Sequence, residues 1–189
     1  MGTRSDIIVH RADGKWHRIY CHWDGYLSHN GRILFDHYTD QKHADALVAL
    51  GNLSILAPKT GKPKGHTFEN KVEGYCVSYS RDRAVGMWCQ EIAKTKAELI
   101  AHEAGEIGDT LQAVWPESDT WTEFTYVWDQ DKWWVTDPDE GTQTLVDLGD
   151  ALSGKRTVKP SVKAFGMILG QHAAHDPAQP NKHTWHSGK

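Results

Sequence analysis

The stretch that organises the rest of the chain is Ile19-Tyr20-Cys21-His22-Trp23-Asp24-Gly25-Tyr26. Its first half is predicted to be the second strand of a β-hairpin, because it follows a short apolar strand at residues 6–10 and the turn-forming pair Asp13-Gly14. Alternate side chains of a strand point to opposite faces. The core face is therefore expected to hold Ile19, Cys21 and Trp23, and the other face Tyr20, His22 and Asp24. Gly25 is expected to allow a sharp exit from the strand.

Three short helices are expected, near residues 28–38, 40–51 and 95–105. Ser28 is a suitable N-cap for a helix that ends near Tyr38, and Asp40 is expected to cap a second helix that stops before Gly51. The sequence Thr95-Lys-Ala-Glu98 forms a capping box, which predicts a helix that runs to Gly105.

A second hairpin is predicted from residues 121–128 and 132–137, which are rich in tryptophan and alternate in polarity. Residues 75–80 predict a strand between the two hairpins, and residues 144–152 a short helix. The resulting fold is α+β, with an antiparallel sheet of about five strands and several short helices packed on one face.

The chain of 189 residues is expected to form a single domain over residues 1–157. A C-terminal helix is expected at 158–174, and a disordered tail at 175–189, which is rich in proline and polar residues. The segment 58–65 has the composition of an exposed, mobile basic loop that contributes nothing to the fold.

The net charge of −4 is distributed unevenly. Residues 97–150 contain one basic and fourteen acidic residues, a net charge of −13, while residues 59–96 carry +4. An acidic block is usually a solvated face, but it can also steer a basic partner, whereas it disfavours binding to duplex nucleic acid. The predicted partner surface consists of Glu117, Asp119, Glu123, Asp129 and Asp131.

The three cysteines, Cys21, Cys76 and Cys89, are widely spaced and odd in number, so neither a disulfide framework nor a zinc knuckle is indicated. The sequence contains no apolar run long enough for a signal peptide or a membrane helix. A reducing, cytoplasmic setting is therefore expected. Cys21 is expected to be buried and inert rather than a nucleophile, because it lies on the apolar face of its strand.

Several blocks of the sequence resemble a family of small bacteriophage and prophage proteins, mostly uncharacterised. The most specific blocks are Thr3-Arg4-Ser5, the stretch 19–26, His37-Tyr38-Thr39 and Leu50 to Ser54. Weaker blocks lie at residues 80–83, 123–128 and 132–135, so the resemblance spans residues 3–137. It implies a phage accessory protein that acts in the host cytoplasm, and it carries over no activity. Leu27 departs from the proline that members often have there.

The first candidate site is the polar cluster Tyr20, His22 and Asp24, with His29 and His37 as further members. Asp24 could orient His22 as a general base, or the group could bind a ligand or a divalent metal. Such clusters more often hold a turn in place by hydrogen bonds. The histidines lack the spacing of a helical metal site, so no metal centre and no cofactor are predicted.

The second candidate site is basic and contains Arg81, Arg83, Lys59, Lys62 and Lys64. Arginines beside aromatic rings suit a phosphate-bearing nucleotide, although an ordinary charged rim is the simpler interpretation. The two candidates together give the predicted ligand-binding residues, which are Tyr20, His22, Trp23, Asp24, Tyr26, Arg81 and Arg83, with Tyr79 nearby.

Three functional hypotheses follow from these sites. The first is a non-catalytic phage accessory protein that binds a host component through the acidic block and counters host defence. The second is a protein that sequesters a small nucleotide signal. The third is an enzyme with His22 as base and Asp24 as orienting carboxylate; the absence of a catalytic motif disfavours it. The sequence leaves the oligomeric state open.

Overall fold

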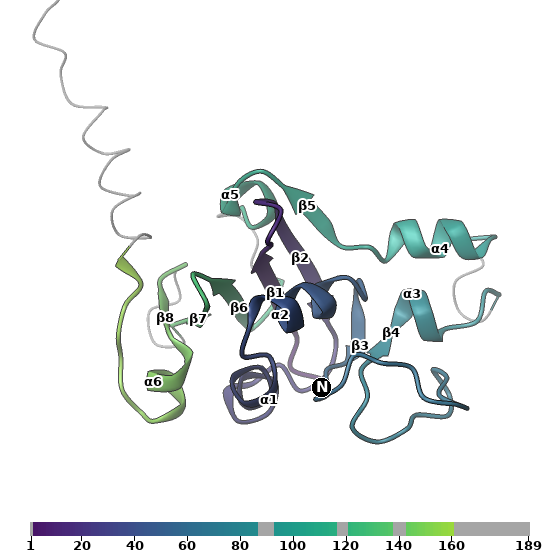
Figure 1. Ribbon diagram of the computed structural model, residues 1–189, viewed down its shortest axis with the longest axis horizontal. Helices are drawn as coiled ribbons and strands as arrows, with labels where there is room; N and C mark the ends of the chain where they lie inside the picture. The colour runs from purple at the N-terminus through teal and green to yellow at the C-terminus, as the bar shows by residue number, and fades with distance from the viewer. Residues whose placement is uncertain (1, 87–92, 117–120, 138–142, 161–189) are drawn as a thin grey trace, which may run out of the picture. The chain divides into compact units, whose positions relative to one another are not determined.

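The computed structural model describes residues 2–86, 93–116, 121–137 and 143–160. The chain divides into two units, Met1–Lys159 and Pro160–Lys189, and all the helices and strands named below belong to the first. This unit is an α+β domain with eight strands in one mixed sheet (Figure 1). Among the described residues, no helix has the length and apolar character needed to cross a membrane.

Both predicted hairpins are confirmed. Strand β1, Ser5–His10, pairs antiparallel with β2, Trp16–Cys21, and β6, Phe124–Asp129, pairs antiparallel with β7, Lys132–Thr136. Gly14 has φ +81° in the first turn, and Gln130 and Asp131 have φ +54° and +56° in the second. Tight hairpin turns of this kind require positive φ. A parallel pairing between β1 and β6 joins the two hairpins into one sheet.

The predicted sheet of about five antiparallel strands is matched only in part, because the sheet has eight strands and is mixed. The remaining strands are β3 at Leu53–Ile55, β4 at Val77–Ser78, β5 at Glu106–Gly108 and β8 at Leu145–Asp147. The order is β4-β3-β2-β1-β6-β7-β8, with β5 beside β2, and the pairs β1–β6 and β2–β3 are parallel. Strands of two or three residues are too short to show alternation, and parallel pairing joins distant segments.

Two helices begin where their caps predict. Helix α2, Gln41–Val48, starts after Asp40, whose side chain accepts the N–H of His43. Helix α4, Lys96–His102, carries the Thr95/Glu98 capping box. Ser28 is not a cap, because the chain turns into a single π-helical turn, η1, at Leu27–Gly31 and continues as α1, Arg32–His37.

Two other expectations need correction. The predicted strand at 75–80 shortens to β4 and becomes helix α3, Tyr79–Asp82, because the Ser78 side chain accepts the N–H of Arg81 as an N-cap. The predicted helix at 144–152 is β8 followed by α6, Leu148–Leu152. Most of the expected helix at 158–174 and the whole expected tail lie outside the described residues, so both stay predictions; of the residues described there, Val158 bridges to Val146 as extended chain.

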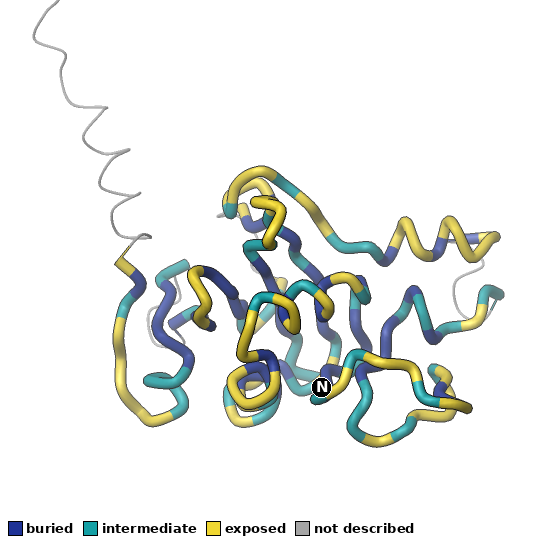
Figure 2. The backbone as a smooth tube through the Cα atoms, viewed as in Figure 1, coloured by how far each residue is buried: buried dark blue, intermediate teal, exposed yellow. Residues whose placement is uncertain are grey.

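The main core lies between the sheet and helices α1, α2 and α6. The inward side chains of the four long strands are buried there, and Figure 2 colours most residues of these strands dark blue. They are Ile7, Val9, Ile19, Cys21, Tyr126, Trp128, Trp133 and Val135, and they pack with Leu34, Leu47 and Leu148 of the helices. The indole N–H of Trp133 donates to the carbonyl of Tyr38 at 2.7 Å, which ties the second hairpin to the end of α1.

The opposite face of the sheet is covered over part of its area. Ile8, Val127 and Trp134 point away from the main core and are nevertheless buried. Helix α5, Leu111–Val114, lies over this face, and the carbonyl of Val114 accepts a hydrogen bond from Arg18 of β2. The helices therefore do not gather on one face, because apolar residues alternate onto both faces of β1 and β6 and both must be shielded from water.

Replacing the core side chain in Leu47→Ala should lower the free energy of unfolding by about 2–5 kcal/mol, since it removes a fully buried side chain and leaves a cavity. The matched control Ile100→Ala, on α4 and half-exposed, should change it by less than about 0.5 kcal/mol. Urea denaturation measures both. Equal losses would show that α4, and not only α2, contributes to the core.

Candidate functional site

The 19–26 stretch is held as a structural turn by a buried side chain that follows it. The amide of Asn30 donates to the hydroxyl of Ser5 at 3.2 Å and to the carbonyl of Trp23 at 3.1 Å. Gly25 approaches β1 so closely that a Cβ there would lie 2.7 Å from the carbonyl of Arg4. The residue with positive φ is Asp24, at +58°, rather than Gly25. Asp24 thus serves the turn, which short polar residues tolerate.

Cys21 is buried beneath this turn, as the strand alternation predicts. Burial raises the pKa of its thiol to about 12, so the thiol stays protonated at neutral pH and is not a nucleophile. Burial likewise raises the pKa of Cys76, and Cys89 lies outside the described residues. Trp23 is not in the core: β2 ends at Cys21, and the Trp23 side chain is 42% exposed.

Tyr20 and His22 form a hydrogen-bonded pair on the face opposite the core. The Tyr20 hydroxyl lies 2.9 Å from Nδ1 of His22. Burial raises the pKa of Tyr20, and the positive charge of the nearby Arg4 opposes that shift. Burial, together with the positive charge of Arg4, lowers the pKa of His22, which favours the neutral ring at pH 7.

The histidine–carboxylate pair that an enzyme would need is not formed at this site. His22 bonds to Tyr20, while Asp24 is turned into the left-handed conformation described above. His29 bonds to the side chain of Asn30, and His37 is exposed at the end of α1. Within the described ranges, no three histidine, cysteine or acidic side chains come together as a metal site would require.

Arg81 is committed to the fold and is not open to a ligand. Its guanidinium forms two hydrogen bonds of 2.8 Å with Asp82 and donates to the carbonyls of Thr60, Gly61 and Cys76. Asp82 is buried, so the Arg81–Asp82 pair is not part of an ordinary charged rim. The same bonds anchor the basic segment 58–65, which the sequence predicted to contribute nothing to the fold.

Arg83 is placed differently from its neighbour. Its guanidinium lies 4.4 Å from the ring centre of Tyr79 and 4.9 Å from that of Phe68, so it is held against two aromatic rings. Its Nε is buried without a hydrogen-bond partner among the described residues. Cation–π contact fixes the position of this charge but leaves its hydrogen-bond donors uncommitted.

The sheet register brings the two predicted candidate sites onto one face. Cys21 is in register with Leu53, and Leu53 with Ser78, so Tyr20, Asn52 and Tyr79 form the next row across β2, β3 and the end of β4. The Tyr20 N–H donates to the side chain of Asn52, and the Tyr79 N–H donates to its carbonyl. Two strand spacings separate the tyrosines, which places their Cα atoms roughly 9–10 Å apart.

Two arginines at this row stand out by their lack of a carboxylate partner. Five of the seven arginines of the chain form an ion pair with a carboxylate, and these are Arg11, Arg18, Arg32, Arg81 and Arg156. The two that pair with no carboxylate of the described segments are Arg4, beside Tyr20, and Arg83, beside Tyr79. Here the surface formed by Arg4, Tyr20, His22, Phe68, Tyr79 and Arg83 is called the aromatic–arginine face.

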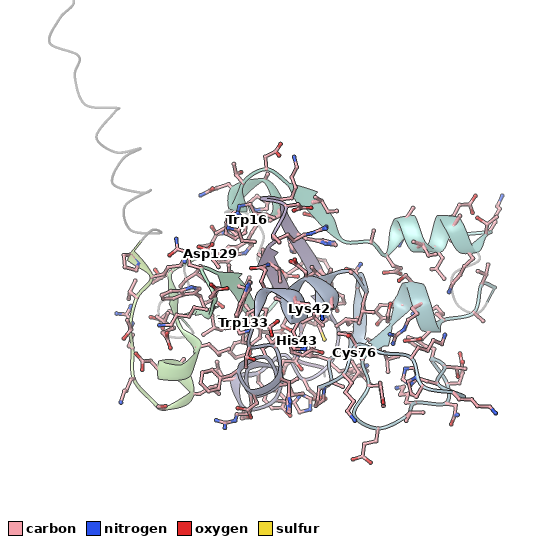
Figure 3. All side chains as sticks on the ribbon, viewed as in Figure 1. Trp16, Lys42, His43, Cys76, Asp129 and Trp133 are labelled. Carbon is pink, nitrogen blue, oxygen red and sulfur yellow. The ribbon has the colours of Figure 1, made fainter. Side chains whose placement is uncertain are left out.

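One residue of the predicted acidic partner surface, Asp129, is engaged in internal ion pairs. Asp129 is buried, with Lys159 at 2.7 Å from one carboxylate oxygen and His10 at 2.9 Å from the other. The ring of His10 stacks on Trp16, which Figure 3 shows near Asp129. Asp129 therefore stabilises the fold and is not available to a partner.

Other acids of residues 97–150 are also paired. Asp137 bonds to Arg156, and Asp147 bonds to Lys132 at 2.6 Å. Arg156 and Lys159 lie just beyond the segment whose charge was counted, which explains why the count of −13 overstates the surface charge. Of the remaining predicted partner residues, Glu123 and Asp131 are exposed, and Glu117 and Asp119 lie outside the described residues.

Of the predicted ligand-binding residues, Tyr20, His22 and Arg83 lie on the aromatic–arginine face. Arg81 is not part of this face, because its guanidinium is bonded within the fold. Trp23 packs edge-on against His22 with ring centres 4.6 Å apart, and Tyr26 is exposed beyond the turn. Sequence reasoning missed Arg4, Asn52 and Phe68 as members or supports of the site. A signal existed for Arg4, because it is the central residue of the Thr3-Arg4-Ser5 block.

The fold and the site define an α+β domain with a polar, aromatic face beside a buried turn. No protein-family model, curated protein or solved structure matches the chain. The resemblance to phage and prophage proteins therefore stays a prediction.

The Arg81–Asp82 clamp should make stability depend on acid pH. Burial alone would raise the pKa of Asp82, but hydrogen bonds from Arg81 and from the N–H of Ser78 outweigh it and lower the pKa below the ordinary 3.8. A lowered folded-state pKa stabilises the fold above pH 3.8, and this stabilisation is lost as the pH falls through the folded-state value. Asp82→Asn should therefore be less stable than the wild type at pH 7, and the difference should shrink by pH 3.

Urea unfolding at pH 7, 5, 4 and 3 measures this difference, and the exposed, ion-paired Asp36→Asn serves as the control. An Asp82→Asn difference that is the same at pH 3 and pH 7 would contradict the assignment of a stabilising carboxylate to Asp82.

Proposed function

We propose that this protein is a non-catalytic binding protein that uses the aromatic–arginine face to hold a planar, anionic ligand of the nucleotide type. The observation that carries the proposal is that Arg4 and Arg83, the two arginines without a carboxylate partner in the described chain, flank a single row of tyrosines. Cationic side chains left without a counter-ion in a folded protein favour a site for an external anion.

The chemistry of the face suits both parts of a nucleotide. A guanidinium can form two parallel hydrogen bonds with a phosphate, and Arg83 is already oriented by Phe68 and Tyr79. The half-exposed rings of Tyr20 and Tyr79 offer surfaces for a base. Nδ1 of His22 is already bonded to Tyr20, so Nε2 is the ring nitrogen left for a ligand.

The resemblance to phage and prophage proteins supplies the biological part of the proposal. A phage accessory protein with such a face would bind a nucleotide signal made by the host and withdraw it from host defence. Binding by sequestration needs no catalytic group, and the separation of His22 from a carboxylate partner supports that choice over hydrolysis.

Isothermal calorimetry with nucleoside monophosphates, nucleoside diphosphates and linear and cyclic dinucleotides tests the proposal. Arg83→Gln should weaken the ligand by at least about tenfold, because a charge-assisted hydrogen bond is worth about 1.5–3 kcal/mol. Arg32→Gln is a matched control, since Arg32 also lies over an aromatic ring, Phe35 at 5.8 Å, but is paired with Asp36.

The control variant should bind as the wild type does, and the corresponding nucleosides without phosphate should bind far more weakly. The absence of heat across the whole panel would refute the proposal. Equal binding by wild type and Arg83→Gln would move the site away from the aromatic–arginine face.

A second candidate function is binding to a host protein through the acidic residues that stay exposed. Glu123 and Asp131 lie on the second hairpin and its approach, and neither forms an ion pair with a described residue. The surface is smaller than the sequence suggested, so the interaction depends on few charges.

The double variant Glu123→Lys/Asp131→Lys should abolish co-purification of a host protein, because two charge reversals repel a basic partner. The reversal Asp36→Lys on α1 controls for the change in net charge alone. Unchanged capture by the double variant would exclude these two residues as the partner surface.

A further inference from the structure

Two exposed tryptophans lie at one end of the aromatic–arginine face, Trp121 against Arg4 and Trp23 against His22. The Trp121 ring is 79% exposed, and the guanidinium carbon of Arg4 lies 6.0 Å from its centre. The Trp23 ring is 42% exposed, packs over Gly2, and meets the edge of His22. Large aromatic side chains that are exposed and grouped near a cation are typical of a surface that binds another molecule.

These two rings extend the aromatic–arginine face beyond the length of one nucleotide. The contacts run from Trp121 to Arg4, from Arg4 to Tyr20 and His22, and across Asn52 to Tyr79 and Arg83. Rings therefore alternate with arginines that have no carboxylate partner in the described chain, from the residues before β6 and β1, past β2, to helix α3 and Arg83 at its end. Alternation of stacking surfaces and cations is the arrangement that proteins use to follow a single nucleic-acid strand.

We propose that this extended face binds a short single-stranded oligonucleotide, with bases stacked on Trp121 and Trp23 and phosphates held by Arg4 and Arg83. The inference rests on the proposed function, because it uses the same two arginines, and it names the ligand class more narrowly. A single strand fits and a duplex does not, since base faces are open to stacking only when the bases are unpaired.

The charge of the protein supports the same choice. With a net charge of −4 and two uncommitted arginines at the face, the protein cannot neutralise the many phosphates that duplex binding requires. Glu123 lies next to Arg4, but its carboxylate accepts the backbone N–H of Arg4 at 2.7 Å and thus faces the main chain. Beyond Arg83, the ammonium of Lys71 lies 6.0 Å from the ring centre of Phe68 and adds positive charge at that end.

The experiment titrates the full chain with thymidine monophosphate and with oligothymidylates of two, four and eight nucleotides, in deoxyribose and ribose forms. Fluorescence of the tryptophans reports stacking, and calorimetry reports affinity. Affinity should rise with length up to about four nucleotides. Trp121→Ala should weaken the longer ligands by at least about fivefold, the lower limit for the loss of one base–aromatic stack, and leave the mononucleotide unchanged. Phe35→Ala, an exposed aromatic on α1, is the control and should change neither.

Salt dependence tests the arginines separately. Two phosphate contacts to a single strand predict a slope of about −1.4 for the logarithm of affinity against the logarithm of salt, and Arg4→Gln should reduce it by about 0.7. Equal affinity for mononucleotide and oligonucleotide, or no effect of Trp121→Ala, would overturn the inference and leave the proposed function standing. Failure of every nucleotide to bind would overturn both. A preference between the ribose and deoxyribose series identifies RNA or DNA as the source.

Discussion

The parallel ladder between β1 and β6 is the constraint on which the domain depends. It joins two hairpins that lie more than a hundred residues apart and gives β1 a long partner on each edge. Ile7, Ile8 and Val9 of β1 are all completely buried, so neither face of the central strand tolerates water. Helices α1 and α2 therefore cover one face of the sheet and α5 covers part of the other. Without α5, the paired residues Ile8 and Val127 would be exposed to water, which would destabilise the β1–β6 pairing.

The 19–26 stretch has two roles that are separated by the alternation of the strand. Cys21 points inward and Gly25 lies in the turn. They pack closely against Asn30, Arg4 and the hydroxyl of Tyr126. This packing positions the outward residues, Tyr20 and His22, next to Arg4. The structural and ligand-binding interpretations of the motif are therefore compatible, since a rigid turn is what sets the position of the side chains on the open face.

Local signals predicted the parts of the fold that are decided locally. The Asp13-Gly14 turn, the Asp40 cap, the Thr95/Glu98 capping box and the alternation of the second hairpin each depend on residues a few positions apart. The short strands and the parallel pairings were missed, because they are decided by packing between distant segments.

The candidate site divides in the same way. Tyr20 and His22 were placed on the outer face by alternation, whereas Arg81 and Arg83 looked equivalent in the sequence. Only the positions of Asp82, Thr60 and Phe68 distinguish a structural clamp from an open cation. Charge counting failed at Asp129 for the same reason, since its partner Lys159 lies thirty residues away in sequence but 2.7 Å away in space.

The placement of Arg83 has an energetic consequence. Contact with Phe68 and Tyr79 restricts the rotamers of the Arg83 side chain in the folded protein. Its buried Nε has no hydrogen-bond acceptor among the described residues. An unsatisfied buried donor costs a fold about 1–3 kcal/mol. The unpartnered Nε therefore lowers the stability of the fold slightly, and the two rings hold the guanidinium in one orientation before any acceptor approaches it.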